Sequence, residues 1–473
     1  MTTIWSRFLE QVEKRPEDPA MAGPGGVFSY ADLAGRTEQL ASMLARRAGP
    51  GDVVGMSVRT TYGAVRGMLA ASAAGAAFLP LGEDDRSARR RMLLDDSGAV
   101  ALMHQPAPGD DIEVDQLGGG EPGSVPQGSA YLMYTSGSTG RPKAVVVSEQ
   151  ALSDRLTGLS RMPGLQAGES ILALTAFTFD ICLAELLLPL MVGATVVASS
   201  PSAQQDPAVF AEDVARHRPD VTQATPSFWR FVVRAGWTGI GARRIWCGGE
   251  ALSPALARDL LDRGTELWNV YGPTEATIWA LADRVNDANR IRLGVPVPGS
   301  GVRLIAGNGS TVEDHTQGSG EIVLTGEGIA TGYLRRPELT AAAFGSVGTL
   351  PLPHYRTGDF GRWDSSGALE FLGRRDAQVK IRGHRLELGE VEAVIERHPE
   401  VSESVVFLVH GDDPVRAYLV AVIVGSSAGA VRTWANENLP GHAVPRRIVV
   451  VPALPRTTAG KVDRVSLGAS LGL

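Results

Sequence analysis

The segment Tyr134-Thr-Ser-Gly-Ser-Thr-Gly-Arg-Pro-Lys143 packs four hydroxyl residues and two glycines into six positions and closes with a lysine. Apolar runs at 131–134 and 145–147 flank it, which predicts a loop between two strands. The backbone N–H groups and hydroxyls of such a loop can surround phosphate oxygens while the lysine supplies positive charge. Composition alone is more typical of a Ser- and Gly-rich turn that binds nothing, and the flanking strands favour phosphate binding.

This loop differs from the Walker P-loop. The Walker motif requires Gly-Lys followed by Ser or Thr, whereas here Pro142 precedes Lys143 and Ala144 follows it. If the loop binds phosphate, it belongs to another class of nucleotide site.

Working outward from the loop, short apolar runs alternate with segments of helical periodicity as far as about residue 374, a pattern typical of a wound α/β architecture. Beyond that point, Val391, Val394 and Ile395 occupy one face of a predicted helix at 388–398, between strand-like runs at 404–409 and 416–425. This change predicts a small α+β domain of about 100 residues at the C-terminal end. Within the larger part, the clearest predictions are strands at 52–58, 170–174, 194–198 and 244–247, helices at 30–45 and 254–263, and an irregular surface connection at 106–127.

Composition excludes several classes of protein. The 473 residues include 45 Lys and Arg against 52 Asp and Glu, a net charge of −7 that argues against nucleic-acid binding as the main role. A hydrophobic content of 44% is ample for folded cores. The two cysteines, Cys182 and Cys247, are too few for a disulfide framework.

The sequence predicts neither a secretory signal nor a membrane span. The N-terminal residues lack a basic segment followed by an apolar core, and the longest apolar stretch, 183–197, is interrupted by Glu185 and Pro189. We therefore expect a cytoplasmic protein that does not bind membranes.

Three further motifs carry groups suited to a nucleotide. Thr274 and Glu275 in Asn269-Val-Tyr-Gly-Pro-Thr-Glu275 offer a hydroxyl for phosphate and a carboxylate for hydrated Mg²⁺, and Cys247-Gly-Gly-Glu250 offers glycines that let the backbone approach a planar base. Tyr355-Arg-Thr-Gly-Asp359 offers a carboxylate for a ribose diol. Taken singly, the first and third are more often turns.

Asp180 and Lys461 each have two interpretations. Asp180 precedes the apolar stretch 181–188, so it is either a helix N-cap or a buried anion that selects a substrate ammonium. Lys461 lies in Thr457-Thr-Ala-Gly-Lys-Val-Asp-Arg464, which is either a solvated basic tail or a loop that carries a catalytic lysine.

Taken together and in this order, the motifs resemble the adenylation domains of nonribosomal peptide synthetases, within the adenylate-forming family that also includes acyl-CoA synthetases and firefly luciferase. The resemblance covers nearly the whole chain. It includes, besides the motifs above, Phe28-Ser-Tyr-Ala-Asp-Leu33, Ala74-Gly-Ala-Ala-Phe-Leu-Pro80, Gly320-Glu321, Gly332-Tyr-Leu334 and Gly373-Arg-Arg-Asp-Ala-Gln-Val-Lys-Ile-Arg-Gly383.

The resemblance implies a two-step reaction. A carboxylate attacks the α-phosphate of Mg-ATP to give an acyl adenylate and pyrophosphate, and the phosphopantetheine thiol of a carrier protein then takes the acyl group. It also implies a large domain of several wound α/β layers at 1–373, a hinge at 374–376 and a small mobile lid at 377–473.

The resemblance further implies a role for individual residues. Thr135, Ser136, Gly137, Ser138, Thr139, Gly140 and Lys143 would hold the β- and γ-phosphates, while Gly248, Gly249, Glu250, Asn269, Tyr271 and Gly272 would surround adenine. Thr274 would contact the α-phosphate, Glu275 the Mg²⁺, and Asp359 with Arg374 the ribose. Asp376 matches the hinge residue, Lys380 the face that forms the thioester, and Lys461 the lysine that bridges substrate carboxylate and phosphate.

Asp180 resembles the residue of amino-acid-activating members that pairs with the α-ammonium group. The aligned substrate pocket comprises Asp180, Ile181, Ala184, Gln223, Trp246, Gly248, Val270, Ile278, Trp279 and Lys461, a pattern similar to glycine-type pockets. A small neutral amino acid is therefore expected, glycine first and L-alanine next. The two tryptophans could equally belong to the core, because large aromatic residues are more often core than lining.

Two other functions are compatible with parts of the sequence. An acyl-CoA or fatty-acyl-adenylate ligase shares the nucleotide motifs but does not need Asp180, and a noncatalytic relative does not need Glu275, Asp359, Arg374 and Lys461. Because the chain stops soon after Arg464, we expect a free-standing enzyme that loads a separate acyl or peptidyl carrier protein. The sequence leaves open whether a small accessory protein is required.

Substitution of Lys461 provides the first test. Since charge accumulates on the pentavalent phosphorus, removal of a bridging cation should lower the adenylation rate strongly, and Lys461→Ala should retain less than about a tenth of it, a barrier increase above ~1.4 kcal/mol. Amino-acid-dependent ATP–pyrophosphate exchange measures the rate, and circular dichroism checks the fold. A folded variant with a higher rate would show that Lys461 is not the central cation.

Overall fold

The computed structural model describes residues 3–82, 87–135, 142–312, 318–345, 353–374, 378–381, 384–411, 416–425, 427–456 and 462–473. It divides into two compact units. The first comprises Met1–Glu83, Leu94–Met133 and Ala144–Arg375, and the second comprises Asp84–Leu93, Tyr134–Lys143 and Asp376–Leu473. The second unit thus includes two short segments that the sequence had assigned to the large domain.

The largest sheet of the first unit is mainly parallel. Its strands are β1 (Pro19–Gly23), β2 (Gly26–Ser29), β9 (Ser170–Ala173), β10 (Thr195–Ala198), β11 (Val221–Ala224), β12 (Arg244–Gly248), β13 (Glu266–Tyr271), β14 (Leu281–Val285) and β15 (Val295–Pro296). They lie in the order β15-β14-β13-β12-β11-β9-β10-β1-β2, with antiparallel strands only at the two ends. Strands β9, β10 and β12 confirm three of the predicted runs.

A second sheet has the order β19-β8-β7-β4-β3-β5-β6. Its strands are β3 (Val53–Ser57), β4 (Ala77–Pro80), β5 (Ala101–His104), β6 (Glu113–Gln116), β7 (Ser129–Thr135), β8 (Lys143–Ser148) and β19 (Gly332–Tyr333). The predicted strands on both sides of the Ser- and Gly-rich loop are therefore confirmed as β7 and β8.

Strand β6 corrects the prediction that 106–127 is wholly irregular. It pairs antiparallel with β5, and Val114 is buried against the main core. A single buried apolar residue in a four-residue strand gives no periodicity, because pairing with a sheet edge rather than an apolar face holds the segment in place.

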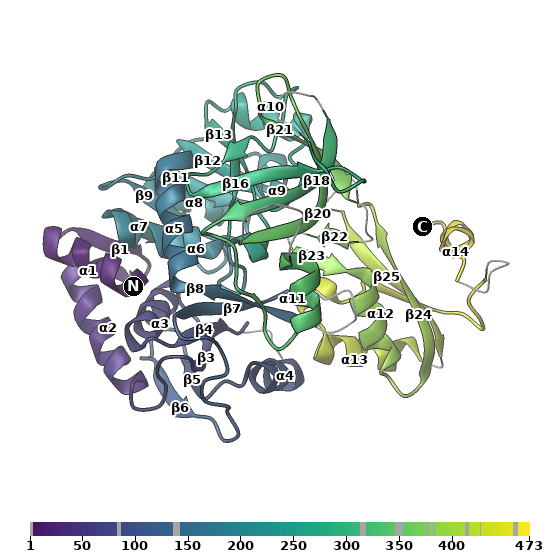
Figure 1. Cartoon of the computed structure of the whole chain (residues 1–473), viewed down its shortest axis with the longest axis horizontal. Coiled ribbons are helices and arrows are strands. Elements are labelled where there is room, and N and C mark those ends of the chain that lie inside the picture. Colours follow the sequence, from purple (N-terminus) through teal and green to yellow (C-terminus); the bar gives the residue numbers. More distant parts are fainter. Residues whose placement is uncertain are drawn as a thin grey trace. The chain divides into compact units, whose positions relative to one another are not determined.

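The third sheet of the first unit is antiparallel. It has the order β17-β16-β18-β20-β21, visible in Figure 1 as the green strands β16, β18 and β20, and consists of β16 (Ser300–Ile305), β17 (Thr311–Val312), β18 (Ser319–Gly326), β20 (His354–Trp363) and β21 (Leu369–Arg374). The motif 355–359 lies inside β20, so its interpretation as a turn at the end of a strand was wrong. Gly358, at φ 73°, supplies the local irregularity that suggested a turn.

Helices cover these sheets or connect their strands. In the first part of the chain they are α1 (Ile4–Lys14), α2 (Tyr30–Leu44), α3 (Thr61–Ala74), α4 (Ser87–Ser97), α5 (Glu149–Leu159), η1 (Ser160–Gly164), α6 (Cys182–Leu186), α7 (Leu188–Val192), α8 (Pro207–His217), α9 (Pro226–Arg234), α10 (Pro254–Leu261), η2 (Thr274–Ala276) and α11 (Pro337–Phe344). Helices α2 and α10 confirm predicted segments. The hydroxyl of Ser29 caps α2 by accepting from Asp32 N–H at 3.1 Å, and the Asp32 carboxylate accepts from Ser29 N–H, a reciprocal capping box.

The C-terminal part of the second unit has its own core. It contains β22 (Gln378–Ile381), β23 (His384–Glu387), α12 (Leu388–Glu396), β24 (Val401–Val409), β25 (Tyr418–Gly425), α13 (Ala428–Asn438), η3 (Gly441–Ala443), β26 (Arg447–Val450) and α14 (Arg464–Leu471). Val391, Val394 and Ile395 of α12 are buried in one cluster with residues of β24 and β25. The predicted apolar face and the small α+β domain are therefore confirmed.

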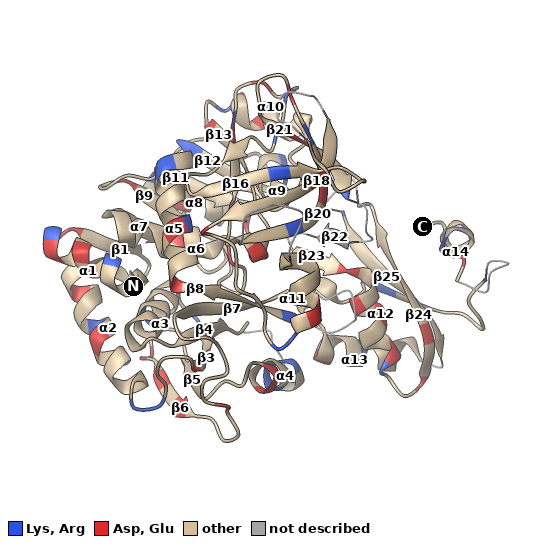
Figure 2. Ribbon diagram, viewed as in Figure 1, with Lys and Arg blue, Asp and Glu red and all other residues tan. Residues whose placement is uncertain are grey.

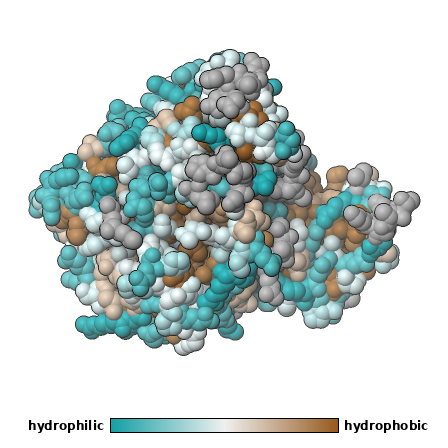
Figure 3. Space-filling view, viewed as in Figure 1, coloured by the Kyte–Doolittle hydropathy of each residue, from teal (hydrophilic) through white to brown (hydrophobic). Residues whose placement is uncertain are grey.

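Basic and acidic residues alternate along helices such as α1 and α2 (Figure 2). On the face shown in Figure 3, hydrophobic residues form small separate patches among hydrophilic ones. Among the described residues, no helix is long and apolar enough to cross a membrane.

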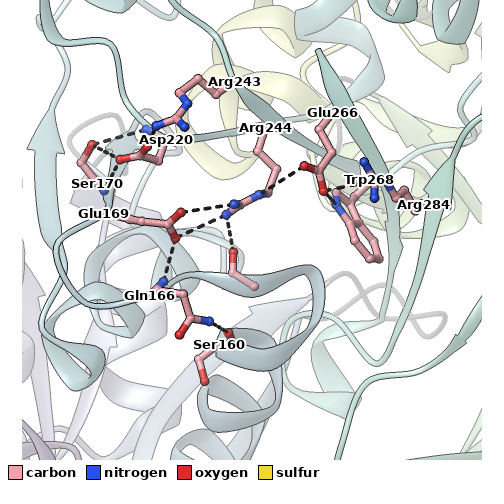
Figure 4. Close-up of polar contacts among 11 residues, drawn as sticks. Ser160, Gln166, Glu169, Ser170, Asp220, Arg243, Arg244, Glu266, Trp268 and Arg284 are labelled. Atoms are coloured by element: carbon pink, nitrogen blue, oxygen red, sulfur yellow. Dashed lines mark hydrogen bonds and ion pairs between the residues drawn. The ribbon is translucent and has the colours of Figure 1, made fainter.

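The amino ends of the parallel strands are held by a network of charged side chains (Figure 4). Arg244, the first residue of β12, donates to Gly164 C=O at 2.7 Å and pairs with Glu169 at 3.2 Å. Its Nε also lies 4.0 Å from Oε2 of Glu266, the first residue of β13. Asp220, which precedes β11, pairs with Arg243 and accepts from the N–H of Ser170 at the start of β9 at 2.9 Å. The network therefore ties together four neighbouring strands.

Replacement of Arg244 tests this network. Arg244→Met should lower the free energy of unfolding by about 1–3 kcal/mol, because Glu169 and Glu266 lose their shared cation while the apolar stem is kept. Thermal unfolding of the purified chain measures it. Arg7→Met is the control, since the exposed Arg7–Glu10 pair at 3.6 Å should contribute less than about 0.5 kcal/mol. Equal effects would contradict the role of the network.

Candidate functional site

The candidate site lies at the carboxyl ends of the parallel strands, opposite the network of Figure 4. The register of the nine-stranded sheet pairs Gln223 with Trp246 and Gly248 with Val270. Because β11, β12 and β13 run in parallel, the turns that follow them reach the same edge of the sheet. Gln223 and Trp246, 23 residues apart in the sequence, and Gly248 and Val270, 22 residues apart, are brought together there.

Asp180 is a buried carboxylate and not a helix cap. Helix α6 begins at Cys182 with Ile181 as N-cap and without a side-chain cap, so the N-cap interpretation of Asp180 was wrong. The residue is 2% exposed, and within the described chain its Oδ2 has no hydrogen-bond partner. A buried carboxylate oxygen without a partner is costly and can be compensated by a cationic ligand.

The surroundings of Asp180 shift its protonation. Burial raises its pKa to about 6, although the nearby hydroxyl of Thr274 and the N–H of Ile278 partly oppose this shift. The buried Tyr131 lies close enough to Asp180 for the carboxylate to raise the pKa of its hydroxyl, which is raised chiefly by burial, and that hydroxyl interacts with Thr277. The unpartnered Oδ2 of Asp180 thus lies in a buried region that contains further hydroxyl groups.

Among the other residues predicted to line a substrate pocket, those that the structure describes are all buried. Ile181, Ala184, Trp246, Val270, Ile278 and Trp279 belong to the main hydrophobic cluster. Gln223 is fully buried, and its amide donates to Ile181 C=O at 2.9 Å and accepts from Trp279 Nε1 at 2.7 Å. Both indoles are therefore buried in the core of the first unit.

Two backbone features keep the predicted pocket wall around Gly248, Val270, Ile278 and Trp279 closely packed. A Cβ on Gly248 would lie 2.3 Å from Val270 O and 2.9 Å from Trp279 Cη2, so only glycine fits there. Thr277 and Ile278 both have left-handed backbones, at φ 56° and 68°. Such a conformation is strained for β-branched residues, by about 1–3 kcal/mol each, and is typical of functional sites.

Tyr271, Asp359 and Arg374 form a second polar group in the first unit. The Arg374 guanidinium donates to Asp359 Oδ1 at 2.6 Å, and the Tyr271 hydroxyl donates to Asp359 Oδ2 at 2.5 Å. Asp359 on β20 and Arg374 on β21 are register partners, so the antiparallel sheet itself sets their distance. The predicted ribose pair is thus assembled together with the predicted adenine-stacking ring.

Residues expected around adenine already have internal partners. Asn269 Nδ2 donates to Arg292 C=O at 2.6 Å, which leaves Oδ1 as the atom suited to accept from a ligand amino group. Glu250 accepts from Ser227 N–H at 3.0 Å and from the Ser227 hydroxyl, so it holds the first turn of α9. Gly249 and Gly272 adjoin them, and a Cβ on Gly272 would lie 2.1 Å from Ile278 O.

Glu275 lies in η2 directly beside Thr274. It is fully buried, and its Oε1 accepts from the Tyr333 hydroxyl at 2.8 Å. No cluster of three or more His, Cys, Asp or Glu suited to a metal occurs in the described residues. One buried carboxylate suits Mg²⁺ that is held mainly by nucleotide phosphates and water, because Mg²⁺ keeps several such ligands.

Several predicted residues are described only in part or not at all. Thr135 is the last residue of β7 and Lys143 is the first residue of β8, and the Thr135 hydroxyl donates to Lys143 C=O at 3.5 Å. Lys380 lies on β22, with its side chain outside the description. Residues outside the described chain are Ser136, Gly137, Ser138, Thr139, Gly140, Asp376 and Lys461.

A cavity of about 790 Å³ in the first unit contains none of the predicted residues. Ser148, Tyr333, Phe344 and His354 are among its lining residues. Two lining residues contact Glu275: the Tyr333 hydroxyl donates to its Oε1 at 2.8 Å, and Ala330 N–H donates to its carbonyl at 2.9 Å. None of the described lining residues has a buried polar side-chain atom without a hydrogen-bond partner.

The structure adds buried charged residues that the sequence analysis did not include. Glu185 accepts four hydrogen bonds beneath Gln223, and burial raises its pKa to about 7. Arg155, 2% exposed, donates to Ala276 C=O at 2.9 Å and so holds the last residue of η2. Glu185 had one sequence signal, an acidic residue inside an apolar run, whereas Arg155 had none.

Two family models match the chain in succession. The model of AMP-binding enzymes matches residues 8–334, and the model of the C-terminal domain of AMP-binding enzymes matches residues 390–461.

Similar curated proteins are multidomain synthetases. The chain is 34% identical over 98% of its length to a segment of tyrocidine synthase 3 from Brevibacillus parabrevis, of which it covers 8%. It is 32% identical over 99% of its length to a dimodular nonribosomal peptide synthase from Bacillus subtilis, of which it covers 21%. The chain thus spans a small part of these relatives.

Similar solved structures include further nonribosomal peptide synthetase proteins. A four-domain nonribosomal peptide synthetase bound to AMP and glycine is 30% identical, with a TM-score of 0.71, and the match covers 98% of this chain and 36% of that one. An NRPS protein that contains adenylation and PCP domains, bound to a vinylsulfonamide inhibitor, is 26% identical with a TM-score of 0.84, over 99% of this chain and 84% of that one.

Proposed function

The chain belongs to the family of AMP-binding enzymes, as an adenylate-forming ligase of the nonribosomal peptide synthetase type, and we propose that it activates a small neutral amino acid with ATP. The observation that carries the proposal is the buried Asp180 carboxylate with one oxygen unpartnered among the described residues, beside Thr274 and Glu275. A carboxylate in that position would pair with the α-ammonium group of an amino acid.

The nucleotide would be held by groups on both antiparallel and parallel sheets. Asp359, oriented by Arg374 and Tyr271, would accept from the ribose hydroxyls, because a carboxylate that already accepts two bonds keeps further lone pairs. The adenine ring would lie against Tyr271 and the backbone of Gly248, Gly249, Glu250 and Gly272, with Asn269 Oδ1 accepting from its amino group. The hydroxyls and N–H groups of residues 135–140, with Lys143, would hold the β- and γ-phosphates.

The chemical step would depend on positive charge near the α-phosphate. Thr274 would donate to an α-phosphate oxygen, and Lys461 would bridge that phosphate and the substrate carboxylate, so that two anions can approach. Mg²⁺, held by Glu275 and the phosphates, would supply further neutralisation of the oxygens. Asp376 is proposed as the hinge residue, and Lys380 as part of the surface used in the second step.

In the second step the phosphopantetheine thiol of a carrier protein would attack the acyl carbonyl, form a thioester and release AMP. The similar NRPS protein that contains adenylation and PCP domains supports a carrier partner. Requirements for an accessory protein do not enter this proposal.

Glycine is the preferred substrate in this proposal, followed by L-alanine. In this proposal Trp246 and Trp279, both in the main hydrophobic cluster, would occupy much of the pocket volume, while the small side chain of Ala184 would leave some of it free. The similar synthetase solved with AMP and glycine supports the same choice. An acyl-CoA or fatty-acyl-adenylate ligase is the alternative, and nothing in such a reaction uses the Asp180 charge.

ATP–pyrophosphate exchange over all twenty amino acids, with fatty and aryl acids as a second panel, tests the function. Exchange should be highest with glycine or L-alanine, and each added methylene should cost ~1–3 kcal/mol in kcat/KM because the tryptophans leave little room. Omission of the amino acid is the control. A best substrate of leucine size or larger would contradict the substrate, and exchange only with fatty or aryl acids would contradict the function.

The protonation of Asp180 gives a pH prediction. Because burial raises its pKa to about 6, lowering the pH through 6 protonates the carboxylate and removes the partner of the ammonium group. The kcat/KM for the amino acid should therefore fall about tenfold per unit below that pH. Initial rates of exchange at saturating ATP measure this profile.

In Asp180→Asn the fall of kcat/KM below pH 6 should disappear. Above pH 7 the activation free energy that corresponds to kcat/KM for the amino acid should rise by at least about 2 kcal/mol. Asp213→Asn serves as the matched control, since Asp213 is also buried but binds Ser200 on another face of the first unit. If both variants behave alike, Asp180 does not bind the substrate.

A further inference from the structure

Glu185 is a buried carboxylate surrounded by hydrogen-bond donors. Its Oε2 accepts from Leu174 N–H and Thr175 N–H, both at 2.8 Å, and its Oε1 accepts from the Thr175 hydroxyl at 2.5 Å and from Gln223 Nε2 at 2.8 Å. Its side chain is fully buried. Four donors and no acceptor face it in the described chain, an arrangement that satisfies a carboxylate and no neutral side chain of the same shape.

This carboxylate determines how the Gln223 amide is oriented. One Nε2 hydrogen goes to Glu185 Oε1 and the other to Ile181 C=O at 2.9 Å. Both neighbours are acceptors, so the NH2 group must face them, and a flipped amide would place oxygen against oxygen. The Gln223 Oε1 is thereby turned to the opposite side.

On that side the Gln223 oxygen accepts from Trp279 Nε1 at 2.7 Å. An indole N–H can only donate, so it needs an acceptor at this point. Trp279 is almost fully buried and lies against Gly248, whose Cβ position is 2.9 Å from the indole. The position of the indole thus follows from a series of hydrogen bonds. Leu174 and Thr175, which follow β9, hold Glu185, Glu185 orients Gln223 on β11, and Gln223 accepts from Trp279.

We infer that Glu185 is a positioning residue for substrate selection, which sets the Gln223 amide so that Trp279 stays in one place against the space next to Asp180. The role rests on the proposed amino-acid activation, because it describes how the same site measures side-chain size. Glu185 itself touches no substrate.

The geometry also indicates what Gln223 and Trp279 cannot offer. Both Nε2 hydrogens of Gln223 and the indole N–H of Trp279 have partners inside the protein. These two residues therefore offer no free N–H donor to a substrate side chain, which suits a side chain that is apolar where it meets them.

The experiment compares Glu185→Gln with Glu149→Gln. Glu149 is another buried carboxylate, which accepts from Ile4 N–H at 2.8 Å and lies outside this series of bonds. Two readouts are taken on each protein. The first is the ratio of kcat/KM for the best amino acid to that for one a methylene larger, together with the KM for ATP. The second is the indole ¹H–¹⁵N spectrum of the ¹⁵N-tryptophan-labelled chain, with the Trp279 signal assigned by Trp279→Phe.

Glu185→Gln should shift the Trp279 indole signal and reduce the selectivity ratio at least about fivefold, because a displaced indole no longer excludes the added methylene. The KM for ATP should stay within about twofold in both variants, and Glu149→Gln should keep the wild-type selectivity and indole signal. If Glu185→Gln does not fold, Glu185→Asp, which keeps the charge but withdraws it from Gln223, should give the same two changes.

The failure of this inference can be told apart from the failure of the proposed function. A folded Glu185 variant with wild-type selectivity and an unmoved Trp279 signal would overturn the positioning role while amino-acid activation stands. Wild-type protein without exchange for any amino acid would overturn the function and the role in selection together, and the indole signal would then report only on the hydrogen-bond series.

Discussion

Parallel pairing of β9, β11, β12 and β13 is the constraint on which the candidate site depends. Parallel strands deliver their carboxyl ends, and the turns that follow them, to one edge of the sheet. Residues from four separate stretches of sequence meet there, while the amino ends are held by the charged network around Arg244. An antiparallel arrangement would send alternate turns to the opposite edge, and the same motifs could not converge.

Three of the buried carboxylates described near this edge, Glu185, Asp359 and Asp180, differ in how they are satisfied. Glu185 receives four donors, and Asp359 pairs with Arg374 and accepts from Tyr271. Asp180 alone of the three keeps an oxygen without a partner in the described chain. Since an uncompensated buried charge is costly, the first two suit internal positioning and the third suits a cationic ligand. The division follows from hydrogen-bond counts and not from residue type.

Apolar periodicity and turn composition predicted much of the fold but missed features that depend on distant pairing. The strands at 170–174 and 244–247 and the helix at 388–398 were confirmed, because each buries a face that its own sequence encodes. Strand β6 and the middle of β20 were not, since pairing with a neighbouring strand determines them. The local pattern left Asp180 open between a helix cap and a buried anion for a similar reason, because it does not reveal that the side chain is buried.

The amino-acid sequence by itself determined the fold class, the family resemblance and the residue types available for nucleotide chemistry, because these depend on local spacing and composition. Only the tertiary structure decided that Asp359 lies between Arg374 and Tyr271, and that Glu185 is linked through Gln223 to Trp279. The physical reason is that these hydrogen bonds join side chains on separate elements, such as Glu185 on α6, Gln223 on β11 and Trp279 in the turn before β14, and only the packed fold brings such residues, 38 and 56 positions apart, within 3 Å of one another. No local pattern encodes such distances.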